Sequence, residues 1–278
     1  MSSNNLPQLK SALNAPSVRQ KFEEMLGKRS SQFMTSITSV VSNNVLLQKA
    51  DVNSIIMGSA VAASMDLPLN ANLGYAALVP FNSKDGCFAQ LQIMVKGWTE
   101  LFLRSGQCKS IICETVYEGQ LVKKNKFTGD YLFDEDAKTS DKIIGFMAYF
   151  QLTNGFEKYD YMTIEEIKAH AQRFSQTYRR GAGIWKDNFE AMAQKTVLKR
   201  LITKYAPKSI EMQRMAMFDQ SIVKGDVENI ENATPEYADN DKSQKIVEVT
   251  DFEEVDTETG EVKKEKDIQP KENNDLDF

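Results

Sequence analysis

The sequence predicts an α+β fold followed by a disordered acidic tail, and three observations lead to this prediction. Short apolar segments stand on either side of turn sequences at 82–86 and at Thr153–Gly155, as in β-hairpins. Segments with apolar residues at helical spacing lie before, between and after these hairpins. Beyond about residue 218 the periodicity ends and acidic residues dominate, which is typical of a chain that buries too little apolar surface to fold.

Helices are expected in the first quarter of the chain, after a flexible N-terminus at residues 1–12. Residues 16–27 are expected to form a helix because Pro16 suits its start and Gly27 suits its end. Residues 31–42 and 51–65 also have helical patterns. The second of these segments is rich in Ala and Ser, which allow close packing.

The middle of the chain is expected to be mostly β. A hairpin around 82–86 is followed by an expected helix at 98–106 and a strand at 110–117. Residues 124–142 are polar and turn-rich, so they predict a loop or a projecting hairpin. Asn154-Gly155 lies between two β-rich runs and predicts a second tight hairpin.

Two further helices are expected after the second hairpin. Thr163 and Glu166 have the spacing of a capping box, which marks a helix start. Residues 187–190 repeat this spacing and open a longer helix, which Pro207 ends. Between the two helices, residues 176–186 are expected to form a flexible basic loop.

The charge of the chain is divided between two regions. Residues 219–278 hold 19 acidic and 7 basic residues, a net charge of −12, whereas residues 1–218 hold 20 acidic and 27 basic residues, a net charge of +7. The formal net charge of −5 therefore hides a basic body joined to an acidic tail. Such asymmetry indicates nucleic acid as a partner of the body, because phosphates attract clustered Lys and Arg.

The most concentrated positive charge lies in the segment 191–209, which contains most of the expected helix and carries five cations and no carboxylate. A helical wheel separates its cations from its apolar side chains, so the basic half is expected to face outward. A solvated helix face is the alternative, but such a face usually carries Glu or Asp four residues from its cations. The candidate nucleic-acid contacts in this helix are Lys195, Lys199, Arg200 and Lys204.

The segment before this helix combines cations with aromatic side chains. This mixture suits single-stranded nucleic acid, because cations follow phosphates and rings stack on bases. Trp185 is equally compatible with an anchor that holds the loop to the core. The candidate contacts in this segment are Arg173, Phe174, Arg179, Arg180, Trp185 and Lys186.

Other classes of protein find less support. Three unevenly spaced cysteines and no secretory segment argue against a disulfide framework, so a reducing cytoplasm is the expected location. The longest apolar run, 143–150, is too short to span a membrane. No metal site is expected, because His170 is the only histidine and no cysteine pair has zinc spacing. The sequence also lacks a Gly-Lys-Ser/Thr phosphate loop, so no nucleotide cofactor is expected.

A metal-dependent nuclease is the enzyme that we considered. Asp160, Glu166 and Lys168 could form part of such a site, which needs carboxylates for Mg²⁺ and a nearby Lys. Sites of this type place Glu-x-Lys on a strand, whereas Glu166 lies at an expected helix start. Helix capping therefore explains Glu166 better, and no catalytic residue is expected.

Four stretches of the sequence resemble the RecT family of phage single-strand-annealing recombinases. Their order and spacing match the family, and with a weaker likeness at 13–26 they cover most of 13–218. The acidic tail lies outside the resemblance. The four stretches are 66–81, 95–119, 156–175 and 185–216.

The resemblance implies a protein that binds single-stranded DNA and anneals complementary strands without ATP, as an oligomeric ring or helical filament. It implies a core in which a twisted antiparallel sheet and helices line a basic groove. Residues 13–218 would form this annealing core and residues 219–278 the disordered tail. The implied partners are single-stranded DNA, a phage exonuclease and a host single-strand-binding protein.

Carried over onto matching positions, the resemblance adds Lys96, Arg104 and Lys109 to the candidate contacts. It also supports Lys195 and Lys199. Two positions depart from the family pattern: Val95 stands where an aromatic residue is frequent, and Gln194 where a second Lys is frequent. A passive protector of single-stranded DNA or RNA, without annealing activity, stays open as the alternative function.

Overall fold

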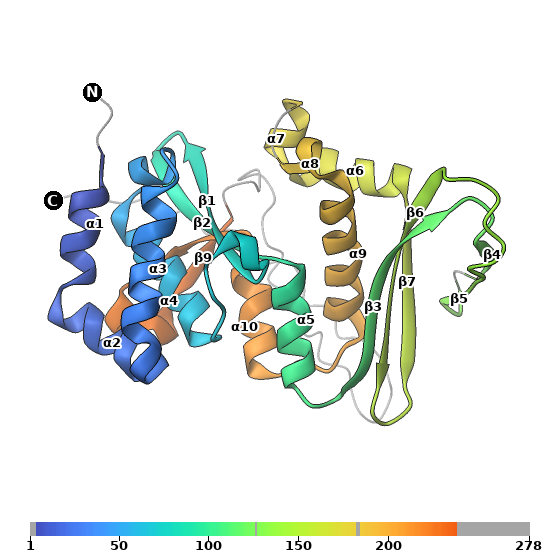
Figure 1. Ribbon diagram of the computed structural model, residues 1–278, viewed down its shortest axis with the longest axis horizontal. Coiled ribbons are helices and arrows are strands. Elements are labelled where there is room, and N and C mark those ends of the chain that lie inside the picture. The colour runs from blue at the N-terminus through green and yellow to red at the C-terminus, as the bar shows by residue number, and fades with distance from the viewer. Residues whose placement is uncertain (1–3, 126, 182–183, 238–278) are drawn as a thin grey trace, which may run out of the picture. The chain divides into compact units, whose positions relative to one another are not determined.

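The computed structural model describes residues 4–237 apart from 126, 182 and 183. These residues belong to a compact unit, Met1–Asn240, whose mixture of helices and antiparallel sheets confirms the α+β prediction (Figure 1). The second unit, Asp241–Phe278, lies outside the described residues, as does most of the expected acidic tail. In the described part of the chain, no helix has the length and apolar character needed to cross a lipid bilayer.

The elements have the following bounds. The α-helices are α1 (Leu6–Leu13), α2 (Pro16–Leu26), α3 (Ser30–Ser42), α4 (Val52–Ser64), α5 (Val95–Arg104), α6 (Ile164–Phe174), α7 (Gln176–Arg179), α8 (Ile184–Asp187), α9 (Phe189–Tyr205) and α10 (Ile210–Phe218). The strands are β1 (Ala76–Ser83), β2 (Gly86–Ile93), β3 (Cys108–Tyr117), β4 (Leu121–Asn125), β5 (Asp130–Phe133), β6 (Ile143–Leu152), β7 (Glu157–Thr163), β8 (Ser221–Lys224) and β9 (Thr234–Glu236).

The N-terminal helices form a layer in which α1, α2 and α3 pack on one another, with α1 and α2 also contacting α4. The expected helices at 16–27 and 31–42 are confirmed as α2 and α3. The expectation of a flexible N-terminus at 1–12 is wrong from Leu6 onward. Helix α1 begins there and buries Leu9 and Leu13, because its apolar residues recur at helical spacing.

Helix α4 joins this layer to the first sheet. Every residue from Ser54 to Ala63 is buried, because α4 packs against other helices on one side and against β2 and β8 on another. The carboxylate of Asp51 caps the helix by accepting a 2.7 Å hydrogen bond from the N–H of Ser54. A Cβ at Gly58 would lie 3.0 Å from Leu78 Cδ2, so glycine permits the close approach of helix and sheet.

The first sheet has the strand order β1-β2-β8-β9, and all its pairs are antiparallel. The hairpin expected around 82–86 is confirmed, since β1 and β2 pair from Ala76–Ile93 to Ser83–Gly86. Residues 219–237, which we expected to belong to the tail, are folded instead. They contribute β8, β9 and a 3₁₀ segment, and they bury Ile222 and Val223.

The second sheet has the strand order β3-β6-β7, and helix α9 packs across one of its faces. The hairpin predicted at Asn154-Gly155 is confirmed, and Gly155 adopts a φ of 89°, which glycine tolerates. The projecting hairpin at 124–142 is present as β4 and β5, which form a separate two-stranded sheet. Over the described residues, the strands therefore form three antiparallel sheets rather than the single sheet that the resemblance implied.

Two local predictions in the C-terminal half have opposite outcomes. The capping box at Thr163 and Glu166 is confirmed, because each side chain accepts a hydrogen bond from the backbone N–H of the other. The capping box at 187–190 is wrong: α9 begins at Phe189, and its N-cap Asn188 makes no side-chain capping bond. The expected basic loop contains the short helices α7 and α8.

Candidate nucleic-acid interface

Three cations of α9 are held by carboxylates from other parts of the chain. Lys195 Nζ lies 3.5 Å from one carboxylate oxygen of Asp219, and Lys199 Nζ lies 2.6 Å from the other. The backbone N–H of Ile93 donates to Asp219 at 2.8 Å. The Asp219 side chain is 0% exposed and that of Lys195 is 7% exposed, so this cluster lies inside the protein. It joins α9 to the junction between α10 and β8 and to the end of β2.

The pKa values of this cluster follow from burial and charge. Burial raises the pKa of Asp219, but the charges of Lys195 and Lys199 and the hydrogen bonds to it outweigh burial, so the net pKa is lowered. Burial also lowers the pKa of Lys195, although Asp219 opposes this shift. Asp219 is therefore ionised at neutral pH, with the amino groups of Lys195 and Lys199 beside its two oxygens.

The expectation that Lys195 faces outward is wrong, because its side chain is buried beside Asp219. The wheel places Lys195 opposite the apolar half, but α9 packs between other elements and both halves are partly covered. The absence of Glu and Asp from residues 191–209 was also misleading. The carboxylate that pairs with Lys195 lies 24 residues further along the chain.

Arg200 ties the same helix to β7. Its guanidinium donates bidentate hydrogen bonds to the carboxylate of Asp160, at 2.5 Å and 2.7 Å. It also donates to the carbonyl of Tyr161 at 3.0 Å. Asp160, which we considered as a nuclease carboxylate, thus has a structural partner. Glu166 has one as well, in the capping box with Thr163.

Two more candidate arginines bind helix ends. Arg104 donates to the carbonyls of Met65 and Asp66 at 3.0 and 3.3 Å, just beyond α4, and pairs with Glu100 at 2.9 Å. Arg179 donates to the carbonyls of Gln172 and Arg173 near the end of α6. These carbonyls lack partners within their own helices, so a guanidinium is a suitable cap.

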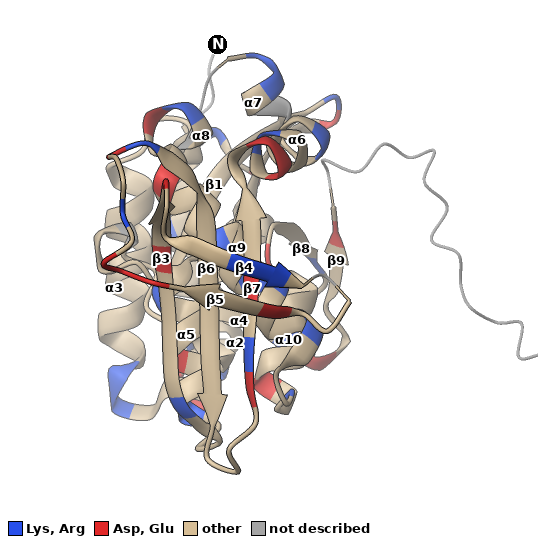
Figure 2. Ribbon diagram, turned by 90° about the vertical axis from the view of Figure 1, so that its right-hand side faces the viewer, with Lys and Arg blue, Asp and Glu red and all other residues tan. Residues whose placement is uncertain are grey.

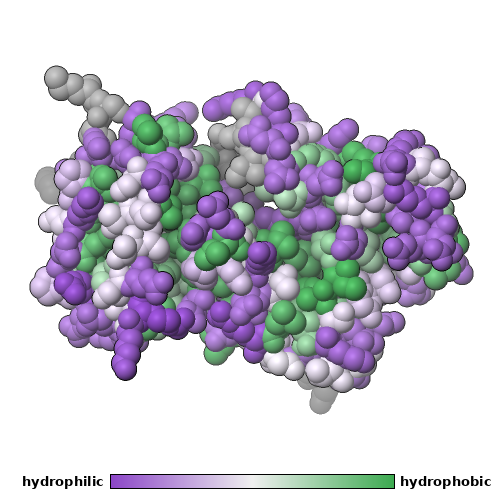
Figure 3. Space-filling model, in the orientation of Figure 1, coloured by the Kyte–Doolittle hydropathy of each residue, from purple (hydrophilic) through white to green (hydrophobic). Residues whose placement is uncertain are grey.

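The remaining candidate cations have no carboxylate partner among the described residues. The side chains of all of these cations are exposed. The Lys204 ammonium lies 4.9 Å from the centre of the Tyr205 ring, and the Arg173 guanidinium lies 5.0 Å from the Phe174 ring. Figure 2 shows basic segments on α6 and α7, and Figure 3 shows hydrophilic side chains gathered over the same region. The available cations are Lys96, Lys109, Arg173, Arg180, Lys186 and Lys204.

The two candidate aromatic residues differ in exposure. Phe174 is 45% exposed and contacts His170, with 4.7 Å between the ring centres. Trp185 is 7% exposed and lies between Tyr178 and Phe189, with ring centres 6.0 and 5.9 Å away. Trp185 is therefore a core residue, whereas Phe174 is available to stack on a base.

His170, on α6, is partly buried and lies near cations of α6 and α9. Burial lowers the pKa of His170, and the charges of Lys199, Arg200 and Arg173 lower it further. The imidazole is therefore neutral at pH 7.

The structure also reveals a cation–aromatic group that the sequence analysis missed. The Lys124 ammonium, on β4, lies 5.4 Å from the Tyr161 ring, and the Lys158 ammonium, on β7, lies 5.7 Å from the Tyr205 ring. Nearby, the rings of Tyr149 and Tyr159 are 4.4 Å apart. The sequence "FEKYDYM" indicates part of this group, because its tyrosines alternate with charged residues and a strand places every second side chain on one face.

Comparison with known proteins gives a family match and two relatives. The model of the RecT family matches residues 31–236. The uncharacterized protein YqaK of Bacillus subtilis (strain 168) is 42% identical over 238 residues, which are 85% of this chain and 81% of that protein. Protein RecT of Escherichia coli (strain K12) is 26% identical over 217 residues, covering 76% of this chain and 79% of that protein. The family match includes the folded residues after 218 that the sequence analysis assigned to the tail.

Proposed function

Because the chain belongs to the RecT family, we propose that it binds single-stranded DNA and anneals complementary strands without ATP, in homologous recombination of the phage type. The observation that carries this proposal is the family match over residues 31–236. The relationship to protein RecT of Escherichia coli supports it. The protein acts here as a binding and annealing module, not as an enzyme, and needs no cofactor.

The exposed cations supply the contacts that such a module needs. Phosphate contacts position a strand and carry no sequence information, so the bases stay free to pair. We assign these contacts to Arg173, Arg180, Lys186 and Lys204, with Lys96 and Lys109 as further contributors. They would line the basic groove that the family resemblance implies. Phe174 adds a ring on which a base can stack.

The paired cations of α9 have a different role in this proposal. Lys195 and Lys199 neutralise Asp219, and Arg200 neutralises Asp160. These contacts fix α9 between β7 and the segment that follows α10. Lys195 and Arg200 therefore position the surface on which the strand lies, while Lys199, whose side chain is 29% exposed, stands at its border.

The proposed setting follows from the same family. The chain assembles with copies of itself into a ring or helical filament, so that each copy holds a few nucleotides and the array holds many. It acts in the cytoplasm, after a phage exonuclease has exposed single strands and alongside the host single-strand-binding protein.

An annealing assay separates this function from passive protection. Two complementary oligonucleotides carrying a fluorophore and a quencher are mixed with the protein in the absence of ATP. An annealing protein accelerates duplex formation relative to the free strands. A slower reaction, together with tight strand binding, would identify a protector and contradict the proposal.

A further inference from the structure

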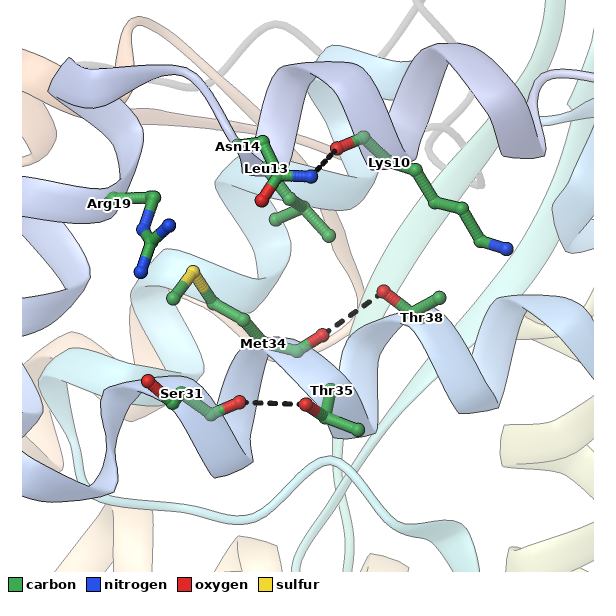
Figure 4. A pocket seen from close by; sticks show the side chains of 8 residues that line it. All are labelled: Lys10, Leu13, Asn14, Arg19, Ser31, Met34, Thr35 and Thr38. Carbon is green, nitrogen blue, oxygen red and sulfur yellow. Dashed lines mark hydrogen bonds between the residues drawn. The ribbon is translucent and has the colours of Figure 1, made fainter.

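A basic cavity lies among the three N-terminal helices, away from the residues assigned above. It has a volume of about 290 Å³ and is lined by side chains of α1, α2 and α3 (Figure 4). This volume is near the lower end of the roughly 300–1,000 Å³ typical of small-ligand sites. The lining includes two cations from different helices, Lys10 and Arg19, and no carboxylate.

The two cations of this cavity have no ion-pair partner within the described part of the chain. Other arginines do: Arg29 pairs with Asp66 at 2.7 Å, and Arg200 pairs with Asp160. Helices α1 and α3 contain no acidic residue at all. The positive charge of Lys10 and Arg19 is therefore not balanced from the cavity walls.

The hydrogen-bond donors of the lining suit an anion. The hydroxyls of Thr35 and Thr38 donate to carbonyls of their own helix, at 2.8 and 3.2 Å, and the amide of Asn14 donates to the carbonyl of Lys10. The strong donors that remain are the ammonium of Lys10 and the guanidinium of Arg19. A phosphodiester is charged and only accepts hydrogen bonds, and a guanidinium fits two of its oxygens at once.

We propose that this cavity binds a phosphate of a polynucleotide backbone. It would be a second phosphate site, in addition to the one around α6 and α9. The proposal rests on the proposed function. Figure 1 shows α1, α2 and α3 on the other side of α4 and the four-stranded sheet from α6 and α9. Part of the lining, including Lys10 and Arg19, precedes residue 31, where the match to the family model begins. A protein that brings two strands together can use two such sites, one for each strand.

A bridging assay with a double variant tests this site. The first, biotinylated strand saturates the protein on a surface, and a labelled strand that is not complementary to it is then added at several salt concentrations. The test variant carries Lys10→Ala with Arg19→Ala. The control carries Lys28→Ala with Lys84→Ala, which removes the same charge from exposed positions outside the cavity.

The test variant is expected to load the first strand as the wild type does and to retain the second strand more weakly. The log–log salt slope for the second strand should fall by about 1.4, which is about 0.7 for each lost contact with single-stranded DNA. The control should keep the wild-type slope. A variant with Lys10→Arg and Arg19→Lys should keep most of the bridging, because both charges remain.

Bridging with the wild-type slope in the test variant, or an equal loss in the control, would overturn the proposal. A change in oligomer size by light scattering without a change in slope would also overturn it, because the cavity would then hold a carboxylate of a neighbouring copy. Failure of the wild type to load even the first strand would refute the proposed function itself. The outcomes for the two proposals are therefore distinguishable.

Discussion

The cations on α9 and those on the segment before it differ in what they contact. Lys195 pairs with Asp219, just after α10, and Arg200 pairs with Asp160 on β7, so carboxylates balance their charge even though the Arg200 side chain is 41% exposed. Arg180 and Lys186 are exposed and pair with no carboxylate in the described chain. Cations that have no acidic residue near them on their own helix face can therefore still be balanced by carboxylates from other elements. Free positive charge must be judged from tertiary contacts.

Replacement of Asp219 should have the largest effect on stability, because it removes the partner of Lys195 and Lys199. In Asp219→Ala the buried Lys195 loses its partner, and Lys199 loses its partner too. Removal of one partner from a buried ion pair costs about 3–5 kcal/mol. Urea unfolding should show this loss, whereas Asp85→Ala, at an exposed turn, should change stability by less than about 0.5 kcal/mol. Similar stability of the two variants would show that the cluster does not hold α9.

The contribution of Asp219 should also depend on pH. Its folded pKa is lowered, so its stabilisation is present above the unfolded pKa of about 3.9 and is lost as pH falls through the folded pKa. The difference in free energy of unfolding between the wild type and Asp219→Asn should therefore be constant from about pH 5 to about pH 7 and should shrink in stronger acid. Unfolding titrations across this range measure it. A difference that grows on acidification would contradict the assigned ionisation.

The two aromatic residues allow a smaller test at the exposed surface. Phe174→Ala should weaken binding of a labelled oligonucleotide by about 1–3 kcal/mol if a base stacks there. Trp185→Phe keeps a ring against Tyr178 and Phe189, so its affinity should match the wild type. Fluorescence anisotropy compares the two variants. Equal affinity of Phe174→Ala and the wild type would remove Phe174 from the interface.

The acidic tail should have the smallest effect, and a salt-dependent one. Residues 238–278 hold 14 acidic and 6 basic residues, and tethering gives them a high local concentration near the cations. Truncation after Tyr237 leaves β9 and the other described elements intact, whereas truncation after Gln220 would remove β8 and β9. We expect the truncated protein to bind single-stranded DNA more tightly at low salt, with a difference that shrinks as salt rises. Equal affinity at low salt would favour partner recruitment as the role of the tail.

Predictions from the sequence succeeded where the signal was local. The capping box at Thr163 depends on residues three apart, and the hairpin at Gly155 depends on the short loop 153–156 between β6 and β7. Both are decided by backbone geometry that neighbouring residues control. The same holds for α2, which has Pro at its start and Gly at its end.

Predictions failed where a distant segment decided the outcome. The four-residue strand β8 pairs with Gln90 and Leu91 of β2, about 130 residues earlier. No local sequence pattern therefore predicts β8. Asp219 also lies outside α9, 24 residues after Lys195, so no pattern within the helix identifies it as the partner. The sequence could name cations with the right chemistry, but only tertiary packing separates those that hold the fold from those that are free.

We propose that the exposed cations without a carboxylate partner, rather than the carboxylate-paired cations of α9, hold the DNA strand. The most direct measurement is the salt dependence of single-strand affinity for Arg180→Ala with Lys186→Ala, compared with Lys28→Ala and Lys84→Ala. We predict that the first pair flattens the log–log slope by about 1.4, at unchanged stability, and that the control pair leaves the slope unchanged. A wild-type slope in the first pair, or the same flattening in both pairs, would contradict the account.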